Sequence, residues 1–360
     1  MIPRVTATID LTALRDNLAR VRRYAPGSHV MAAVKADGYG HGAVPVARTL
    51  ADAGVDALAV ACLEEAVKLR DAGIAAPIAL LEGVMSEDEA REAVRQHLQI
   101  VVHDPWQLAL LESLQDATLS LWFKIDTGMH RLGFAPTAVP VLANALQQRP
   151  AWNFCGWITH LACADEADNP MTQRQIALFD EILGTLPGAR SIANSAGLIA
   201  WPLTRREWVR PGLALYGASP LPEQSAADLG LRPAMRVEGR LLSIHDVPEG
   251  ATIGYGATYR CPQLMRIGVV AVGYADGYDR NLPTGTPVLV CGRRAPMVGR
   301  VSMDMITIDL REVPEARVGD TVTLWGEGLP AEEIARYAGT LVYELFCGLT
   351  KRVHFSYSGF

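Results

Sequence analysis

Eight short apolar runs, separated by stretches with helical periodicity, limit most strongly how this chain can fold. The runs lie at residues 29–36, 56–62, 76–83, 98–104, 119–128, 154–162, 190–197 and 212–219. Between them, as in GAVPVARTLADAG and TQRQIALFDEILGTL, apolar residues recur three and four positions apart. Neighbouring parallel strands need a crossover, usually a helix. The alternation therefore predicts a TIM-like (β/α)8 barrel, and strands that are apolar throughout fit burial on both faces.

The pattern of the sequence changes after about residue 230. Segments with strand character follow one another through turns, and only PAEEIARYAGT has helical periodicity there. We therefore expect a barrel domain over residues 1–230 and a mostly β C-terminal domain over residues 231–360. TATIDL, near the start, has the pattern of a single strand, so we expect residues 1–10 to pair with the C-terminal domain.

Composition argues against several classes of binding partner. The net charge is −6, and no run of lysine or arginine stands out, which argues against nucleic acid and anionic membranes. No apolar stretch has the length of a membrane span, and the first residues lack a signal-peptide core, so we expect a cytoplasmic protein. The six cysteines form no CxxC pair, so we expect reduced thiols and no metal site.

Barrel enzymes carry their chemistry at the C-terminal ends of the strands. The polar residues expected at those ends form a rim rich in positive charge. They are Lys35, Tyr39, Lys124, Asp126, Arg131, His160, Asn194, Ser195 and Arg210, followed by Gly212 and Leu213.

Lys35 has two interpretations. A lysine at a strand end often extends its amine into solvent. Lys35, however, follows an apolar run and precedes a Gly-Tyr-Gly turn, and an amine at an apolar mouth loses its proton readily and forms imines with carbonyl groups. The segments ANSAG and VRPG lie where barrels commonly bind phosphate, although such residues are also ordinary turn formers. An imine-forming lysine together with a phosphate site suggests pyridoxal phosphate.

Nine segments together resemble bacterial alanine racemases. They are VKADGYGHG, KIDTGMHRLG, THLACADE, NSAG, WVRPGLALYG, IGYGATY, GYADGY, VGRVSMDM and YELFCGLTKRV, and they run in the order of that family from about residue 4 to 353. The resemblance implies a homodimeric enzyme that interconverts L- and D-alanine with pyridoxal phosphate, each β domain capping the partner's barrel. It implies a role in supplying D-alanine for peptidoglycan or in degrading it.

The resemblance also implies two bases on opposite faces of the substrate. Lys35 matches the lysine that holds the cofactor and serves as one base, and Tyr255 matches the other base, supplied by the partner chain. From the residues alone, the favoured interpretation of Tyr255 is a strand aromatic of the β domain. The resemblance implies that Tyr39 contacts the cofactor phosphate, and it places the remaining cofactor contacts at Asn194, Ser195, Gly212 and Leu213.

Arg210 matches the arginine that faces the pyridine nitrogen, and His160 the residue that hydrogen-bonds it. An arginine stays protonated and only donates, so it would keep that nitrogen neutral. Arg131 and the backbone N–H of Met303 match contacts to the substrate carboxylate. Lys124 matches a lysine that is carbamylated in many members of the family, which would turn a repulsive neighbour of Arg131 into an attractive one.

Tyr274, Arg280 and Arg300 match residues of the corridor through which substrate enters, although plain surface residues are a rival interpretation. Three other functions compete with alanine racemisation: a racemase for serine or a broader set of amino acids, a decarboxylase of the same architecture, and a non-catalytic pyridoxal-phosphate carrier. Decarboxylases of this architecture usually place an acid at the pyridine nitrogen, which Arg210 contradicts. Carriers resemble the barrel alone, so the β domain and Tyr255 argue against one.

Overall fold

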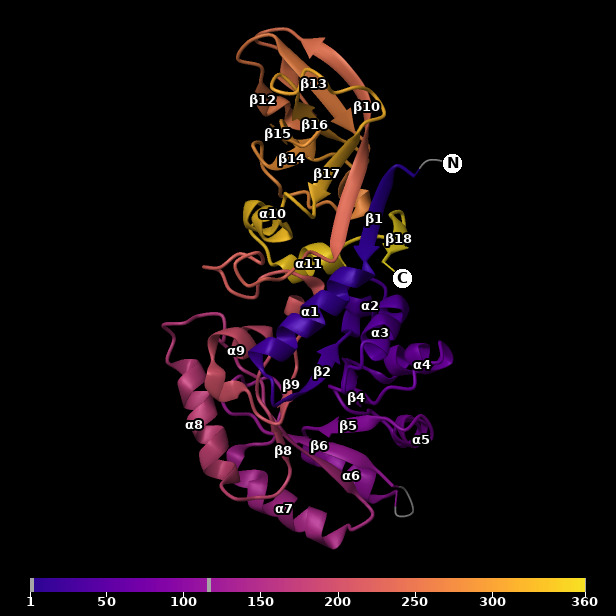
Figure 1. Ribbon diagram of the computed structural model, residues 1–360, viewed down its shortest axis with the longest axis vertical. Helices are drawn as coiled ribbons and strands as arrows, with labels where there is room; N and C mark the ends of the chain where they lie inside the picture. The colour runs from indigo at the N-terminus through magenta and orange to yellow at the C-terminus, as the bar shows by residue number, and fades with distance from the viewer. Residues whose placement is uncertain (1–2, 115–117, 360) are drawn as a thin grey trace. The chain divides into compact units, whose positions relative to one another are not determined.

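The computed structural model describes residues 3–114 and 118–359, which form two compact units (Figure 1). The barrel unit comprises Leu14–Leu215 and Ser219–Gln224. The strand-rich unit comprises residues 3–13, Tyr216–Ala218 and residues 225–359. In the sequence, the barrel unit is therefore an insertion between parts of the strand-rich unit.

The barrel is closed by eight parallel strands in chain order. They are β2 (His29–Ala33), β3 (Ala57–Val60), β4 (Ile78–Leu80), β5 (Gln99–Val102), β6 (Ser120–Lys124), β7 (Asn153–Ile158), β8 (Ala189–Ser191) and β9 (Trp208–Val209). The ring closes where β9 pairs with β2, Trp208 beside His29 and Val209 beside Val30. The predicted (β/α)8 barrel is thus confirmed.

This part of the chain contains the following helices, most of which follow amphipathic stretches, whereas the segment after Lys35 was expected to be a Gly-Tyr-Gly turn. They are α1 (Leu11–Tyr24), α2 (Lys35–Tyr39), α3 (Ala43–Asp52), α4 (Leu63–Asp71), α5 (Glu87–Arg95), α6 (Pro105–Glu112), α7 (Val139–Gln148), α8 (Met171–Leu183) and α9 (Ser195–Ala200). The side chains of Ser86 and Asp104 accept backbone hydrogen bonds at the starts of α5 and α6, which fixes where these helices begin. Across residues 3–114 and 118–359, no helix combines the length and apolarity that crossing a membrane requires.

The run at 212–219 is not a strand. The eighth strand is the two-residue β9, and the apolar run forms the 3₁₀ turn η3 (Leu213–Tyr216). All four residues of η3 are at most 3% exposed. Their apolarity therefore reflects burial of a turn, which hydrophobicity alone cannot distinguish from a buried strand.

The interior of the barrel is filled by side chains of unequal size. Met31, Ala57, Ala59, Ala79, Val101, Trp122 and Ile158 form one buried cluster. The small alanines leave room for the indole of Trp122, whose Nε1 donates to Gln99 Oε1 over 2.8 Å. A β-carbon on Gly156 would lie 2.8 Å from the same ring. The barrel is therefore a packed core, and chemistry is confined to its ends.

The strand-rich unit is organised around β10 (Met235–Val247). This strand pairs antiparallel with β1 (Val5–Asp10), β13 (Met265–Val270) and β17 (Thr321–Trp325), and β1 also pairs in parallel with β18 (His354–Ser358). The other strands are β11 (Thr252–Ile253), β12 (Tyr259–Arg260), β14 (Pro287–Val290), β15 (Arg293–Pro296) and β16 (Ile306–Asp309). The mostly β character of this region is confirmed. Besides the expected helix α10 (Ala331–Ala338), a second helix, α11 (Val342–Cys347), is present.

Candidate functional site

Every barrel residue singled out from the sequence lies at or just after the C-terminal end of a strand. Lys35 and Tyr39 follow β2. Lys124 is the last residue of β6, Arg131 follows that strand, and His160 follows β7. Asp126 also follows β6. Asn194 and Ser195 follow β8, Arg210 and Gly212 follow β9, and Leu213 opens η3. The structure therefore brings these residues to one end of the barrel, which we call the barrel mouth.

The backbone after Lys35 has an unusual conformation. Ala36, Asp37, Gly38, Tyr39 and Gly40 all have positive φ, between 51° and 74°. For residues with a β-carbon this left-handed region costs about 1–2 kcal/mol each, so it persists only where the surroundings enforce it. The left-handed turn directs Tyr39 into the protein, where it is 8% exposed.

Helix α4 supplies the contacts that hold this turn. The carboxylate of Glu65 accepts from the Ala36 N–H over 2.7 Å and from the Ala61 N–H over 2.8 Å. Lys68 Nζ lies 2.7 Å from Asp37 Oδ1. Burial would raise the pKa of Asp37, but the hydrogen bonds from Lys68 and Ala43 hold this pKa below its ordinary value. Glu65 and Lys68 were not singled out from the sequence, because they look like ordinary charges on an exposed helix.

Arg210 is held rigidly at the barrel mouth. Its guanidinium donates to Ser191 Oγ and to the Thr159 carbonyl, each over 2.5 Å. It lies 3.4 Å from His160 Nδ1. Burial, followed by the positive charge of Arg210, lowers the pKa of His160 well below its ordinary value. An arginine only donates, so His160 Nδ1 is the acceptor in this contact. Ser191 and Thr159 were not singled out from the sequence.

Positive charge is concentrated around Lys124. Burial and the charges of Arg210, Arg131 and Lys35 lower the pKa of Lys124 to about 8, and Asp126 is the acid that acts in the opposite direction. The carboxylate of Asp126 is occupied by the loop that carries Arg131, where it accepts from the N–H groups of Gly128 and His130. The barrel mouth is therefore suited to anionic groups.

The ends of β8 and β9 meet through Ser195. Its Oγ accepts from the N–H of Gly212 over 2.9 Å and from that of Ala214 over 3.2 Å. A hydroxyl that accepts two hydrogen bonds still has one proton to donate. The side chain of Asn194 accepts from the Gly197 N–H and so caps α9.

Tyr255 lies on a turn of the strand-rich unit, not in a strand. It opens the 3₁₀ turn η4 (Tyr255–Ala257), and both flanking glycines, Gly254 and Gly256, have positive φ. The tyrosine is 72% exposed, so its hydroxyl is accessible. A β-carbon on Gly256 would lie 3.2 Å from the Arg300 guanidinium, which places Arg300 beside this turn.

Tyr274 and Met303 lie on two loops that are joined through the backbone. The Tyr274 N–H donates to the Ser302 carbonyl over 3.1 Å, and the Ala275 N–H donates to the Met303 carbonyl over 3.0 Å. The approach is so close that a β-carbon on Gly273 would lie 2.3 Å from the Met303 carbonyl oxygen. Tyr274 and Met303 are exposed all the same, at 39% and 52%.

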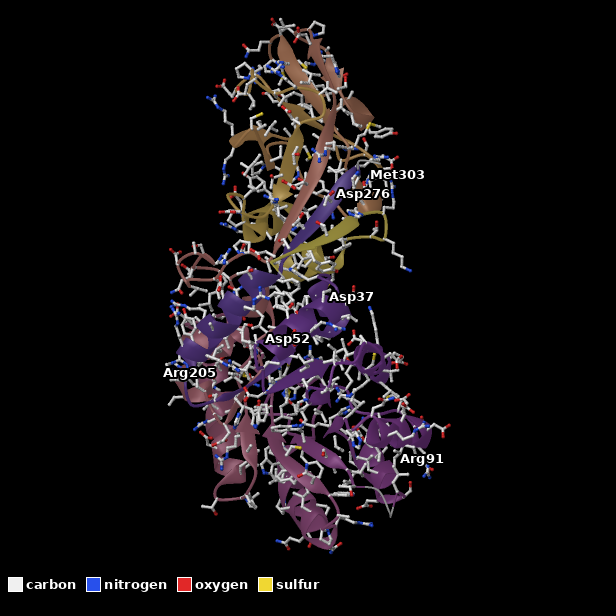
Figure 2. The ribbon with its side chains drawn as sticks, turned by 45° about the vertical axis from the view of Figure 1, so that its right-hand side comes forward. Asp37, Asp52, Arg91, Arg205, Asp276 and Met303 are labelled. Carbon is white, nitrogen blue, oxygen red and sulfur yellow. The ribbon has the colours of Figure 1, made fainter. Side chains whose placement is uncertain are left out.

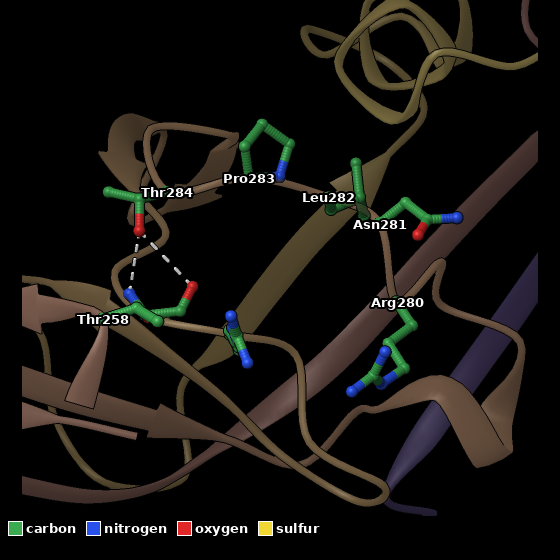
Figure 3. Close-up of a pocket in the computed structure, with 8 residues that line it drawn as sticks. Thr258, Arg280, Asn281, Leu282, Pro283 and Thr284 are labelled. Atoms are coloured by element: carbon green, nitrogen blue, oxygen red, sulfur yellow. Dashed lines mark hydrogen bonds between the residues drawn. The ribbon is translucent and has the colours of Figure 1, made fainter. Parts of the chain in front are cut away.

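Arg280 and Arg300 line an open pocket of ≈ 490 Å³ in the strand-rich unit (Figure 3). The hydroxyl of Thr284 closes one side of it, through hydrogen bonds with the backbone of Gly299. No acidic residue appears among the described residues that line it. The five residues singled out in this unit thus lie on neighbouring loops or around this pocket.

The fold and site define a barrel enzyme with a lysine at a cationic strand-end mouth and a separate strand-rich unit. Residues 9–220 match the model of the alanine racemase N-terminal domain, and residues 234–357 that of the alanine racemase C-terminal domain. An alanine racemase of Nitrosococcus oceani is 51% identical over 350 residues, which cover 96% of this chain and 97% of that protein. The chain belongs to the alanine racemase family and is a racemase.

Comparison with solved structures points to the same family. A biosynthetic alanine racemase from Pseudomonas aeruginosa superposes with a TM-score of 0.96 at 46% identity, covering 99% of this chain and 100% of the other. An alanine racemase from Bacillus anthracis, solved with bound L-Ala-P, gives 0.87 at 33% identity over 100% of this chain and 96% of that one. The likeness therefore extends over both units.

Proposed function

We propose that this protein interconverts L- and D-alanine with pyridoxal phosphate as its cofactor, as part of the supply of D-alanine for peptidoglycan or of its breakdown. The observation that carries the proposal is the placement of Lys35 at the barrel mouth, among other positively charged side chains. The charges of Arg210, Arg131 and Lys35 all lower the pKa of Lys124 there. Membership of the family supports the same reaction.

The residues present fit this cofactor. The Ser195 hydroxyl, the backbone of Gly212 and Leu213, and the hydroxyl of Tyr39 would hold the phosphate, with Asn194 shaping the loop. Arg210 would donate to the ring nitrogen, because its guanidinium is fixed by Ser191 and Thr159 and His160 accepts from it. When bound, the cofactor draws electrons from the attached amino acid and so acidifies its Cα proton.

Two residues would move the proton at Cα. Lys35 Nζ would take or return it on one face, and the hydroxyl of Tyr255 of the partner subunit would do so on the other. Arg131 and the Met303 N–H would hold the substrate carboxylate, while Tyr274, Arg280 and Arg300 would line its access. The 72% exposure of Tyr255 supports a site completed by a second copy of the chain.

Lys124 would be carbamylated. A pKa of about 8 leaves a fraction of this amine unprotonated near neutral pH, and only that form reacts with carbon dioxide. The product is an anion, which would attract Arg131 where the ammonium repels it.

The decisive experiment incubates the pyridoxal-phosphate-loaded protein with each L-amino acid and separates the enantiomers by chiral chromatography. We expect D-alanine to form fastest. Faster conversion of L-serine would assign a different racemase, and absence of any D-amino acid would contradict the proposal.

A further inference from the structure

Arg352 joins the two loops that carry Tyr274 and Met303. Its Nε lies 3.3 Å from Asp276 Oδ1, and its Nη2 lies 2.7 Å from Asp304 Oδ1. Asp276 ends the 3₁₀ turn η5 (Tyr274–Asp276), and Asp304 directly follows Met303. Figure 2 labels Asp276 and Met303 in this part of the strand-rich unit.

The Asp276 carboxylate is the inner end of this link. It is 3% exposed, and a charge so buried requires partners. One oxygen accepts from the Gly273 N–H over 3.0 Å, which fixes the start of η5, and the other faces Arg352. The backbone of Asp276 is held as well, because its carbonyl accepts from the Thr350 N–H over 3.2 Å.

Asp304 is the outer end. Its carbonyl accepts from Arg4, and its carboxylate pairs with Arg352. The Ser302 and Met303 carbonyls accept from η5. These backbone hydrogen bonds fix the orientation of the peptide that presents the Met303 N–H. Arg352 ties the side chain of the next residue, Asp304, to the buried carboxylate of η5.

We propose that Arg352 is a positioning residue, which aims the Met303 N–H at the substrate carboxylate by clamping Asp304 to Asp276. This proposal rests on the proposed function. A group that positions a binding N–H affects substrate affinity before and during the reaction alike, so its loss raises KM with little change in kcat.

The test uses the cofactor-loaded enzyme. In Arg352→Gln we expect KM for L-alanine to rise about tenfold and kcat to stay within about twofold. In the same protein, hydrogen exchange of peptides covering residues 271–280 and 299–308 should quicken. Arg352→Lys keeps a charge but reaches only one carboxylate, and it should recover part of the loss.

Arg294→Gln is the matched control. Arg294 is 53% exposed against 42% for Arg352, and it pairs with Glu333 in the same unit, on elements other than these loops. It should leave KM and the exchange of both loops unchanged. An unchanged KM in Arg352→Gln overturns the proposal, as does a lowered melting temperature without a change in KM. If the parent protein racemises no alanine, the proposed function fails, and exchange of the two loops still decides whether Arg352 holds them.

Discussion

The hydroxyl of Tyr39 lies directly against Gly212, where a β-carbon would stand 2.5 Å from its oxygen. Gly212→Ala should therefore displace Tyr39 from the proposed phosphate site. We expect the affinity for pyridoxal phosphate to fall about tenfold or more, because a misplaced hydrogen-bonding group costs on the order of 1–3 kcal/mol. Cofactor titration followed by absorbance measures this.

Gly27→Ala is the control for that substitution. It lies in the same unit, nothing is within 4 Å of its added β-carbon, and its φ is not positive. The control should bind the cofactor like the parent. Equal affinity in Gly212→Ala would show that Tyr39 takes no part in cofactor binding.

Lys35→Ala should abolish racemisation and the covalent attachment of the cofactor. The reason is that Lys35 is the amine at the end of β2 that we propose both to bind the cofactor and to move the Cα proton. Borohydride reduction followed by peptide mass spectrometry should find the cofactor on Lys35 of the parent and nowhere in the variant. Activity at the parental level in Lys35→Ala would refute the mechanism.

Lys124 should make stability depend on pH when carbon dioxide is absent. Its folded pKa of about 8 lies below the ordinary 10.5, so the buried charge destabilises the fold fully below pH 8. Between these values the folded chain has lost the proton that the unfolded chain keeps, and the penalty shrinks as pH rises. Lys124→Met should therefore melt higher than the parent at pH 7, by a margin that diminishes above pH 8. A margin independent of pH would contradict this.

Carbamylation of Lys124 has a separate signature. Lys124→Ala should lose activity and regain part of it when acetate or another small carboxylate replaces the missing anion beside Arg131. Chloride at equal ionic strength is the control and should not rescue. Full activity in the variant without any addition would exclude the role.

A site shared between two chains should show complementation. Lys35→Ala and Tyr255→Ala should each be inactive, whereas a heterodimer would hold one site with both defects and one with neither. Equal amounts that are unfolded, mixed and refolded should recover about a quarter of parental activity. Heterodimers that form and remain inactive would show that both residues act within one chain.

The barrel was predictable because each strand from β2 to β8 overlaps an apolar run bounded by turn residues. The eighth strand was misplaced because β9 has two residues, too few to show any pattern, while the buried turn η3 mimics a strand. The turn at Tyr255 was equally hidden, since alternating glycines and aromatic residues are compatible with a strand or a turn.

The residues of the barrel mouth were predictable because strand ends in a barrel converge. The residues that hold these side chains in place were not predictable from the sequence. The left-handed φ of Ala36 and Asp37 opposes the local preference of both residues, and Glu65 and Lys68, which stabilise it, lie on a helix some thirty positions away. Arg352 is a comparable case, because only the folded chain brings it to Asp276 and Asp304.

Strand β1 has a consequence for how the protein folds during synthesis. It lies between β10 and β18, with Thr6 opposite both Glu238 and His354, so both of its neighbours are synthesised more than two hundred residues after it. The segment that builds the barrel is translated in between, and contacts of such long sequence separation form slowly. Until β18 has been synthesised, one edge of β1 has no strand to pair with. A nascent chain in which β18 has not yet formed is therefore exposed to pairing with other chains along that edge.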